Sequence, residues 1–81
     1  MKIPVIKKLV EKFSLSELEE ADEAIINEKQ PAIEVEGEDE GEQLTHVMAA
    51  VWIKTYLKSH EGVAFKDALR EYTKKVRTSI S

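Results

Sequence analysis

The stretch from about Glu42 to Ser59 constrains the fold more than any other part of this chain. Its periodicity predicts one helix, yet its apolar residues point in nearly every direction around that helix. One side carries Leu44, Val47, Met48, Val51 and Trp52, and most of the remainder carries Ala49, Ala50, Ile53, Tyr56 and Leu57. A helix that is apolar nearly all round must be buried nearly all round. We therefore expect it to be the central packing element.

Two shorter helices are predicted before this central helix. Pro4 fits the first turn of a helix that ends near Lys12, because its missing N–H costs nothing there. Ser14 and Glu17 then form a capping box, which begins the second helix near Leu15. The apolar stripes of the two helices are Ile6, Leu9, Val10 and Phe13 in the first, and Leu15, Leu18, Ala21 and Ile25 in the second.

The segment between the second helix and the central helix is acidic and predicted to be extended. Pro31 is expected to stop the second helix, and residues 32–36 alternate apolar and charged side chains. Such a short stretch either remains an extended connector or pairs as a strand with its counterpart in a second subunit. Gly37 and Gly41 bracket an exposed acidic turn.

A fourth helix is predicted from about Ala64 to Ser79, after Gly62 ends the central helix in the left-handed conformation. With 81 residues, the chain is long enough for one core and short for two. The sequence thus predicts an all-α fold, a small four-helix domain that covers residues 1–81, with an acidic extended connector between helices two and three.

Composition narrows the class of protein. The chain contains no cysteine, which excludes disulfides and thiolate metal sites. Charged residues interrupt every apolar run, so we expect neither a signal peptide nor a membrane span, and a cytoplasmic location follows. The net charge of −4 hides an uneven distribution of charged residues along the sequence. Residues 1–16 carry a net charge of +3, residues 17–42 carry −11 and residues 43–81 carry +4.

Three short helices can hardly cover the central helix completely, so part of its apolar surface is expected to face another molecule. The residues assigned to this candidate interface are Trp52, Ile53, Tyr56 and Leu57, whereas Met48 and Phe65 are interpreted as core. The leading functional hypothesis is therefore a non-enzymatic protein–protein interaction or regulatory module. Its first expected partner is a second copy of the chain, which would make it a homodimer.

An alternative hypothesis is nucleic-acid binding through the last helix. A basic stripe of Lys66, Arg70, Lys74 and Arg77 lies along one side of it. Solvation, together with the favourable placement of cations near a helix C-terminus, explains the same stripe. The overall acidity of the chain repels phosphates at long range, which disfavours this alternative.

A second alternative is metal-dependent chemistry at Glu42 and His46, which share a helix face and have Asp39 or Glu38 nearby. Two residues at helical spacing match no zinc or calcium pattern, so His46 is interpreted as a polar boundary residue and no metal or other cofactor is expected. The chain also lacks nucleophile, phosphate-loop and dinucleotide motifs. We therefore assign no catalytic residue.

The opening MKIPVIKKLVEKFSLSELEEA, the middle PAIEVEGEDEGEQLTHVMAAVWI and the close FKDALREYTKKVRTSI together resemble a family of small uncharacterised bacterial proteins. The resemblance covers nearly the whole chain. It implies a bacterial cytoplasmic protein. That family has no assigned activity, so the resemblance transfers no catalytic or binding residue.

Overall fold

The computed structural model describes the backbone of residues 2–80 and the side chains of residues 2–77. Four helices follow in order: α1 (Ile3–Lys12), α2 (Leu15–Ile26), α3 (Glu40–Ser59) and α4 (Phe65–Ile80). Residues 2–80 contain no strand, so the all-α prediction with four helices is confirmed. None of the helices in the described part of the chain is long and apolar enough to cross a membrane.

The boundary between α1 and α2 lies where the sequence predicted it. Ser14 and Glu17 make the expected capping box: Ser14 Oγ accepts a hydrogen bond from the Glu17 N–H at 3.2 Å. In return, the Ser14 N–H donates to Glu17 Oε1 at 2.9 Å. These two bonds satisfy donors that a helix start leaves open, and Phe13 before them is extended.

Helix α2 ends earlier than Pro31 requires. Its last residue is Ile26, and Glu28 adopts the left-handed conformation with φ of 58°. The Glu28 N–H donates to the Ile25 carbonyl at 3.0 Å, and the Lys29 N–H donates to the Ala24 carbonyl at 2.7 Å. This pair of bonds is a Schellman motif, so local backbone geometry stops the helix before the proline does.

Helix α3 begins two residues before the predicted position because Asp39 caps it, with Oδ1 accepting from the Glu42 N–H at 2.8 Å. It ends as expected: Gly62 has φ of 83°, a left-handed conformation that glycine adopts without strain. The turn around Gly62 redirects the chain into α4.

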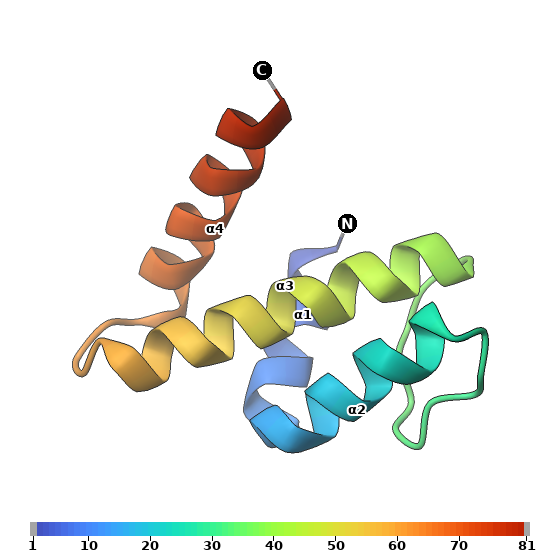
Figure 1. The fold of residues 1–81 in the computed structure, drawn as a ribbon. Helices are drawn as coiled ribbons and strands as arrows, with labels where there is room; N and C mark the ends of the chain where they lie inside the picture. The colour runs from blue at the N-terminus through green and yellow to red at the C-terminus, as the bar shows by residue number, and fades with distance from the viewer. Residues whose placement is uncertain (1, 81) are drawn as a thin grey trace.

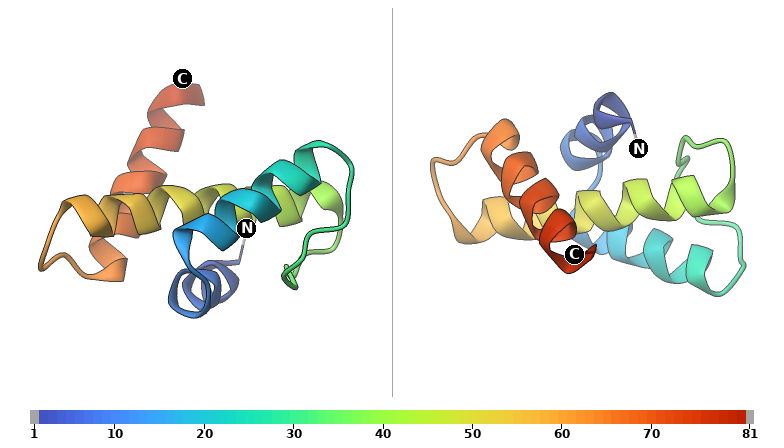
Figure 2. Two further views of the ribbon diagram at one scale, coloured as in Figure 1. Left: turned by 60° about the horizontal axis from the view of Figure 1, so that its bottom comes forward. Right: turned by 90° about the horizontal axis from the view of Figure 1, so that it is seen from above.

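The other three helices all contact α3, which is therefore the central element, as predicted (Figure 1). In the views of Figure 2, α2 runs beside α3, α1 crosses α3 on a different side, and α4 crosses it near its C-terminal half. The largest fully buried side chains are Ile6, Leu18, His46, Val47 and Ile53. The core thus follows one side of α3.

Residues 27–39 connect α2 to α3 through turns, bends and irregular backbone. The connection is fastened to α3: Val35 is buried, and its carbonyl accepts a hydrogen bond from Gln43 Nε2 at 3.1 Å. At Gly37, an added Cβ would lie 2.8 Å from the Gln43 backbone nitrogen, so only glycine fits this close approach. Within the described chain, residues 32–36 do not pair as a strand.

Helix α4 is only partly packed. Ala68 is buried, and Phe65, Leu69 and Tyr72 are half-buried against the core, whereas Val76 is 38% exposed. Figure 1 shows the C-terminal turns of α4 rising away from the rest of the molecule. The first half of α4 therefore belongs to the domain body, and the second half projects from it.

Candidate functional site

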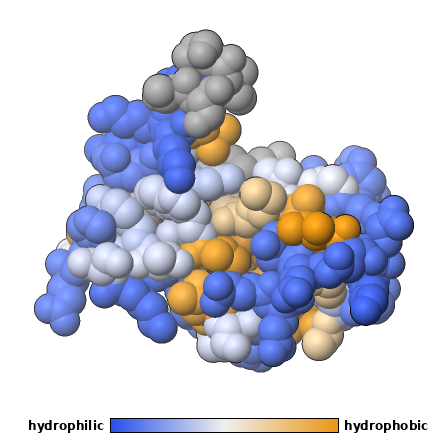
Figure 3. All heavy atoms as spheres, in the orientation of Figure 1, coloured by the Kyte–Doolittle hydropathy of each residue, from blue (hydrophilic) through white to orange (hydrophobic). Residues whose placement is uncertain are grey.

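An open apolar groove follows the face of α3 that the other helices leave uncovered. Its volume is about 430 Å³. Helix α3 supplies most of its lining at helical spacing, with one residue from α2; the lining residues are Asp22, Met48, Val51, Trp52, Thr55, Tyr56, Ser59 and His60. Figure 3 shows hydrophobic side chains gathered across the middle of the molecule. We call the groove lined by these eight residues the α3 groove.

A row of aromatic rings runs along the α3 groove. Trp52 stacks on Tyr56 with ring centroids 5.2 Å apart, and Tyr56 stacks on His60 at 4.0 Å. From α4, Tyr72 adds a tilted ring 5.6 Å from Trp52, and burial raises the pKa of its hydroxyl. Lys75 Nζ lies 5.6 Å from the centroid of Trp52. Rings held against one another in this way form a rigid apolar surface.

Asp22 brings an acidic group to the α3 groove from α2. Its Oδ1 is occluded from solvent and has no hydrogen-bond partner within the described residues. Desolvation by burial raises the pKa of this carboxyl, and the nearby charges of Glu19 and Glu23 raise it further. A buried acceptor without a donor costs free energy. The groove therefore combines apolar surface with one acceptor that lacks a donor.

The structure separates the four residues of the predicted interface. Trp52 and Tyr56 line the α3 groove, whereas Leu57 is half-buried against the core. The placement of Ile53 on that face is wrong, because its side chain is 0% exposed. The small neighbours Ala49 and Ala50 are also buried and let the adjoining helices approach, which encloses Ile53.

Two other interpretations of apolar residues have different outcomes. Met48 was interpreted as core, which is wrong: its side chain is 49% exposed and lines the α3 groove. Phe65 is half-buried and packs against the core, in agreement with the interpretation. The apolar surface that sequence reasoning placed around Trp52, Ile53, Tyr56 and Leu57 is thus formed instead by Met48, Val51, Trp52 and Tyr56.

The basic stripe keeps its predicted form. Lys66, Arg70, Lys74 and Arg77 are all exposed on α4, while Ala68, Leu69 and Tyr72 of the same helix face the core. The stripe does not line the α3 groove. Its first member, Lys66, belongs to the packed half of α4, and its last, Arg77, belongs to the projecting half.

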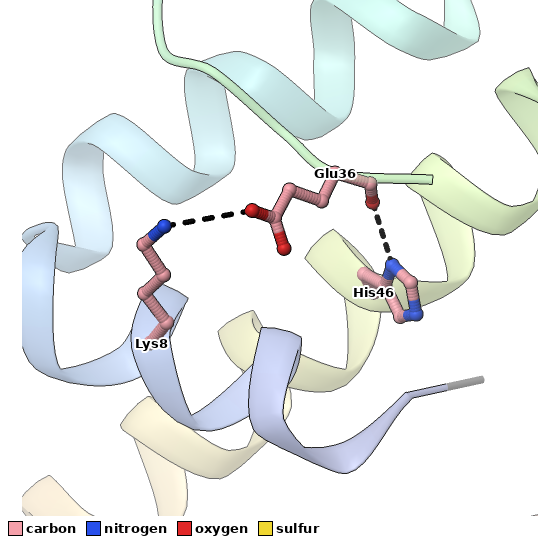
Figure 4. A network of polar contacts seen from close by, with 3 residues as sticks. All are labelled: Lys8, Glu36 and His46. Carbon is pink, nitrogen blue, oxygen red and sulfur yellow. Dashed lines mark hydrogen bonds and ion pairs between the residues drawn. The ribbon is translucent and has the colours of Figure 1, made fainter. Parts of the chain in front are cut away.

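His46 is not a boundary residue: its side chain is 0% exposed, so that interpretation is wrong. Nε2 accepts a hydrogen bond from the Lys2 N–H at 2.9 Å, which leaves Nδ1 to donate to the Glu36 carbonyl at 2.8 Å. Figure 4 shows this second bond beside the ion pair between Glu36 and Lys8, whose atoms lie 3.5 Å apart. His46 thus joins three segments of the chain.

Glu42, the other half of the suggested metal pair, is also engaged by the backbone. Its Oε1 accepts a hydrogen bond from the Glu38 N–H at 2.9 Å at the start of α3. Both nitrogens of His46 are occupied by backbone groups as well. Among the side chains that the structure describes, no three His, Cys, Asp or Glu residues gather in the way a metal ion requires.

Sequence reasoning missed Asp22 as a site residue. It lies among Glu17, Glu19, Glu20 and Glu23, and a charged helix face is usually solvated, so nothing distinguished it. The available signal was its position one residue after Ala21 and three before Ile25, both of which are buried. That position places Asp22 at the edge of the packed stripe.

Comparison with known proteins finds one match. Neither the curated proteins nor the solved structures contain a significant match to this chain. One family model, that of a family of unknown function (DUF6952), matches residues 1–81. The protein therefore belongs to the DUF6952 family.

Proposed function

We propose that this protein is a non-enzymatic protein–protein interaction module and that the α3 groove is its docking surface. The observation that carries this proposal is the mainly apolar surface of an open groove of about 430 Å³, to which Met48 contributes a side chain that is 49% exposed. On a small domain, a contiguous patch of exposed apolar side chains is more often an interaction site than a surface without a role in binding.

The shape of the α3 groove favours a protein chain over a small molecule. Its lining extends along α3 from Met48 to His60, which is about 18 Å at the rise of an α-helix. Lining residues recur every three or four positions, the pattern that an amphipathic helix recognises when it lies in a groove. We expect the occupant to be helical and to present its apolar face.

The first occupant we propose is a second copy of the chain. A domain of 81 residues buries a modest fraction of its surface, so covering the α3 groove in a symmetric dimer adds stability that the monomer lacks. The absence of cysteine supports action in a reducing compartment such as the cytoplasm.

Light scattering across a dilution series tests this proposal. The wild-type chain is expected to change from dimer to monomer on dilution, and Met48→Glu is expected to remain a monomer at every concentration. A charge placed within an apolar interface is costly to bury. Unchanged helical circular dichroism shows that the variant is folded.

The matched control is Ile26→Glu, since Ile26 is 59% exposed and does not line the α3 groove. This variant is expected to dimerise like the wild type. If Met48→Glu keeps the wild-type mass at all concentrations, the α3 groove is not the self-interface. If the wild type is a monomer throughout, self-association itself is excluded.

Nucleic-acid binding through the basic stripe is the rival proposal. The exposure of Lys66, Arg70, Lys74 and Arg77 allows it, but the net charge of −4 opposes it. Filter binding of labelled RNA and duplex DNA at low salt discriminates the two proposals. Retention that falls steeply as salt rises supports the rival, and no retention removes it.

A further inference from the structure

We infer that the α3 groove of one copy receives the projecting half of α4, residues 73–77, from a second copy, and that Arg77 of this segment pairs with Asp22. The inference rests on the proposed function and names the segment that docks. It brings together an apolar groove with an acidic edge and a basic helix end. Within one copy, Tyr72 and Lys75 of α4 already lie beside Trp52 of the groove, whereas Val76 and Arg77 beyond them are exposed.

The projecting half of α4 has the amphipathic character that the α3 groove requires. The stripe of Phe65, Leu69 and Tyr72, which packs on the core, continues at Val76, which is 38% exposed. In Figure 1 and in the left view of Figure 2, this end of the helix lies apart from α1 and α2. The apolar stripe of α4 thus extends past the part of the core that covers it within its own copy.

The charges of the two surfaces are opposite. Helix α2, which forms the Asp22 edge, carries five acidic residues and no basic residue between Leu15 and Ile26. Residues 70–77 carry four basic residues against one acidic residue, a net charge of +3. Opposed edges of this kind orient a docking helix and exclude like-charged competitors.

Asp22 gives the complementarity a specific point of contact. The Asp22 side chain lines the α3 groove and is only half-buried, and a guanidinium offers several donors to one carboxylate. On a helix, adjacent residues are separated by about 100°, so Arg77 flanks Val76 and reaches the edge of a groove that Val76 enters. Arg77 is exposed in its own copy.

The dimensions permit a reciprocal exchange. Residues 73–77 span about 6 Å along a helix, which is less than the length of about 18 Å that the α3 groove offers. In a two-fold dimer, each copy inserts one helix end into its partner and receives one in return. Both grooves are then filled, so no binding surface is left to recruit a third copy.

Charge reversal tests the inference at low ionic strength. Asp22→Arg and Arg77→Asp are each expected to raise the dimer dissociation constant about tenfold, because each places like charges together. The double variant Asp22→Arg/Arg77→Asp restores opposite charges at both contacts and is expected to return to within about threefold of wild type. Lys66→Asp, an equal change in the packed half of α4, is the control and should leave dimerisation unchanged.

Disulfide trapping gives a second readout that does not depend on charge, because the natural chain has no cysteine. A mixture of the Val76→Cys and Thr55→Cys variants is expected to form a cross-linked heterodimer under mild oxidation. The control mixture, Lys66→Cys with Thr55→Cys, should not form one. Each cysteine variant is first shown to be folded by circular dichroism.

The outcomes separate this inference from the proposed function. If Met48→Glu abolishes the dimer while Arg77→Asp and the Val76 cross-link have no effect, the α3 groove is the interface but α4 does not occupy it. If the wild type never dimerises, both are overturned. Loss of the dimer in Arg77→Asp, with recovery in the double variant, supports both.

Discussion

The backbone N–H of Lys2 donates a hydrogen bond to Nε2 of His46, a residue 44 positions later, at 2.9 Å. The opposite ring nitrogen of His46, Nδ1, donates to the Glu36 carbonyl at 2.8 Å, because Nε2 is occupied as an acceptor. One buried side chain therefore connects the start of α1, the segment before α3 and α3 itself.

We predict that His46→Ala lowers the free energy of unfolding by about 3 kcal/mol. The substitution leaves a cavity in the core and removes the partners of the Lys2 N–H and the Glu36 carbonyl. Urea denaturation followed by circular dichroism measures the change. The neighbouring Thr45→Ala is the control, because Thr45 is exposed and should alter stability by less than about 0.5 kcal/mol. Equal effects of the two variants would contradict the role assigned to His46.

The raised pKa of Asp22 predicts a dependence of stability on pH. Because the folded state holds this proton more tightly than the unfolded chain, the contribution is fully present below pH 3.8, the ordinary value for aspartate. It is lost as the pH rises through the raised pKa of the folded state. Asp22→Asn removes the titration, so the stability of this variant relative to wild type should increase with pH across that window.

Glu17→Gln is the control for Asp22, because its pKa moves in the opposite direction. The hydrogen bond from the Ser14 N–H, and then the bond to the Ser14 side chain, lower the pKa of Glu17 from 4.5. Its contribution is present above pH 4.5 and is lost as the pH falls through the lowered value. NMR titration of both carboxyls checks the two directions, and a lowered pKa at Asp22 would refute the first.

The two sides of α3 should respond differently to truncation. Ile53→Ala is expected to lower the free energy of unfolding by about 3 kcal/mol, since Ile53 is fully buried. Met48→Ala should cost less than about 1 kcal/mol in the monomer, because half of the Met48 side chain already contacts solvent. Denaturation at a concentration where the protein is monomeric checks both values. A reversed order would mean that α3 is rotated from the orientation described.

A fourth prediction concerns the two left-handed residues at helix ends. Glu28 has φ of 58°, so Glu28→Gly should raise the free energy of unfolding by about 1 kcal/mol. Gly62 has φ of 83°, and Gly62→Ala should lower it by about the same amount. Thermal unfolding measures both. Changes of the same sign in the two variants would be inconsistent with the described backbone.

The helices and their order followed from sequence because local signals define them. Ser14 with Glu17 marks the start of α2, and Gly62 marks the turn after α3. The end of α2 did not follow, since Glu28 carries no sequence sign that it adopts the left-handed conformation. Pro31 gave the more visible signal, although the helix stops at Ile26.

The candidate site was only partly predictable. A helix that is apolar on most sides does not reveal which side its neighbours cover, so Trp52 and Tyr56 were placed correctly on the open face whereas Ile53 and Met48 were exchanged between surface and core. Long-range contacts decide such matters. The burial of His46 depends on its contacts with Lys2 and Glu36. The position of His46 within α3 does not reveal these contacts.

The central position of α3 also bears on how the chain folds as it is made. α1 and α2 leave the ribosome first, yet both contact α3 more extensively than they contact each other. Their apolar stripes stay without a partner until residues 40–59 have been added, which takes about 1 to 4 s at typical rates of translation. Folding thereby waits for α3, and released chains truncated before Glu40 will expose both stripes.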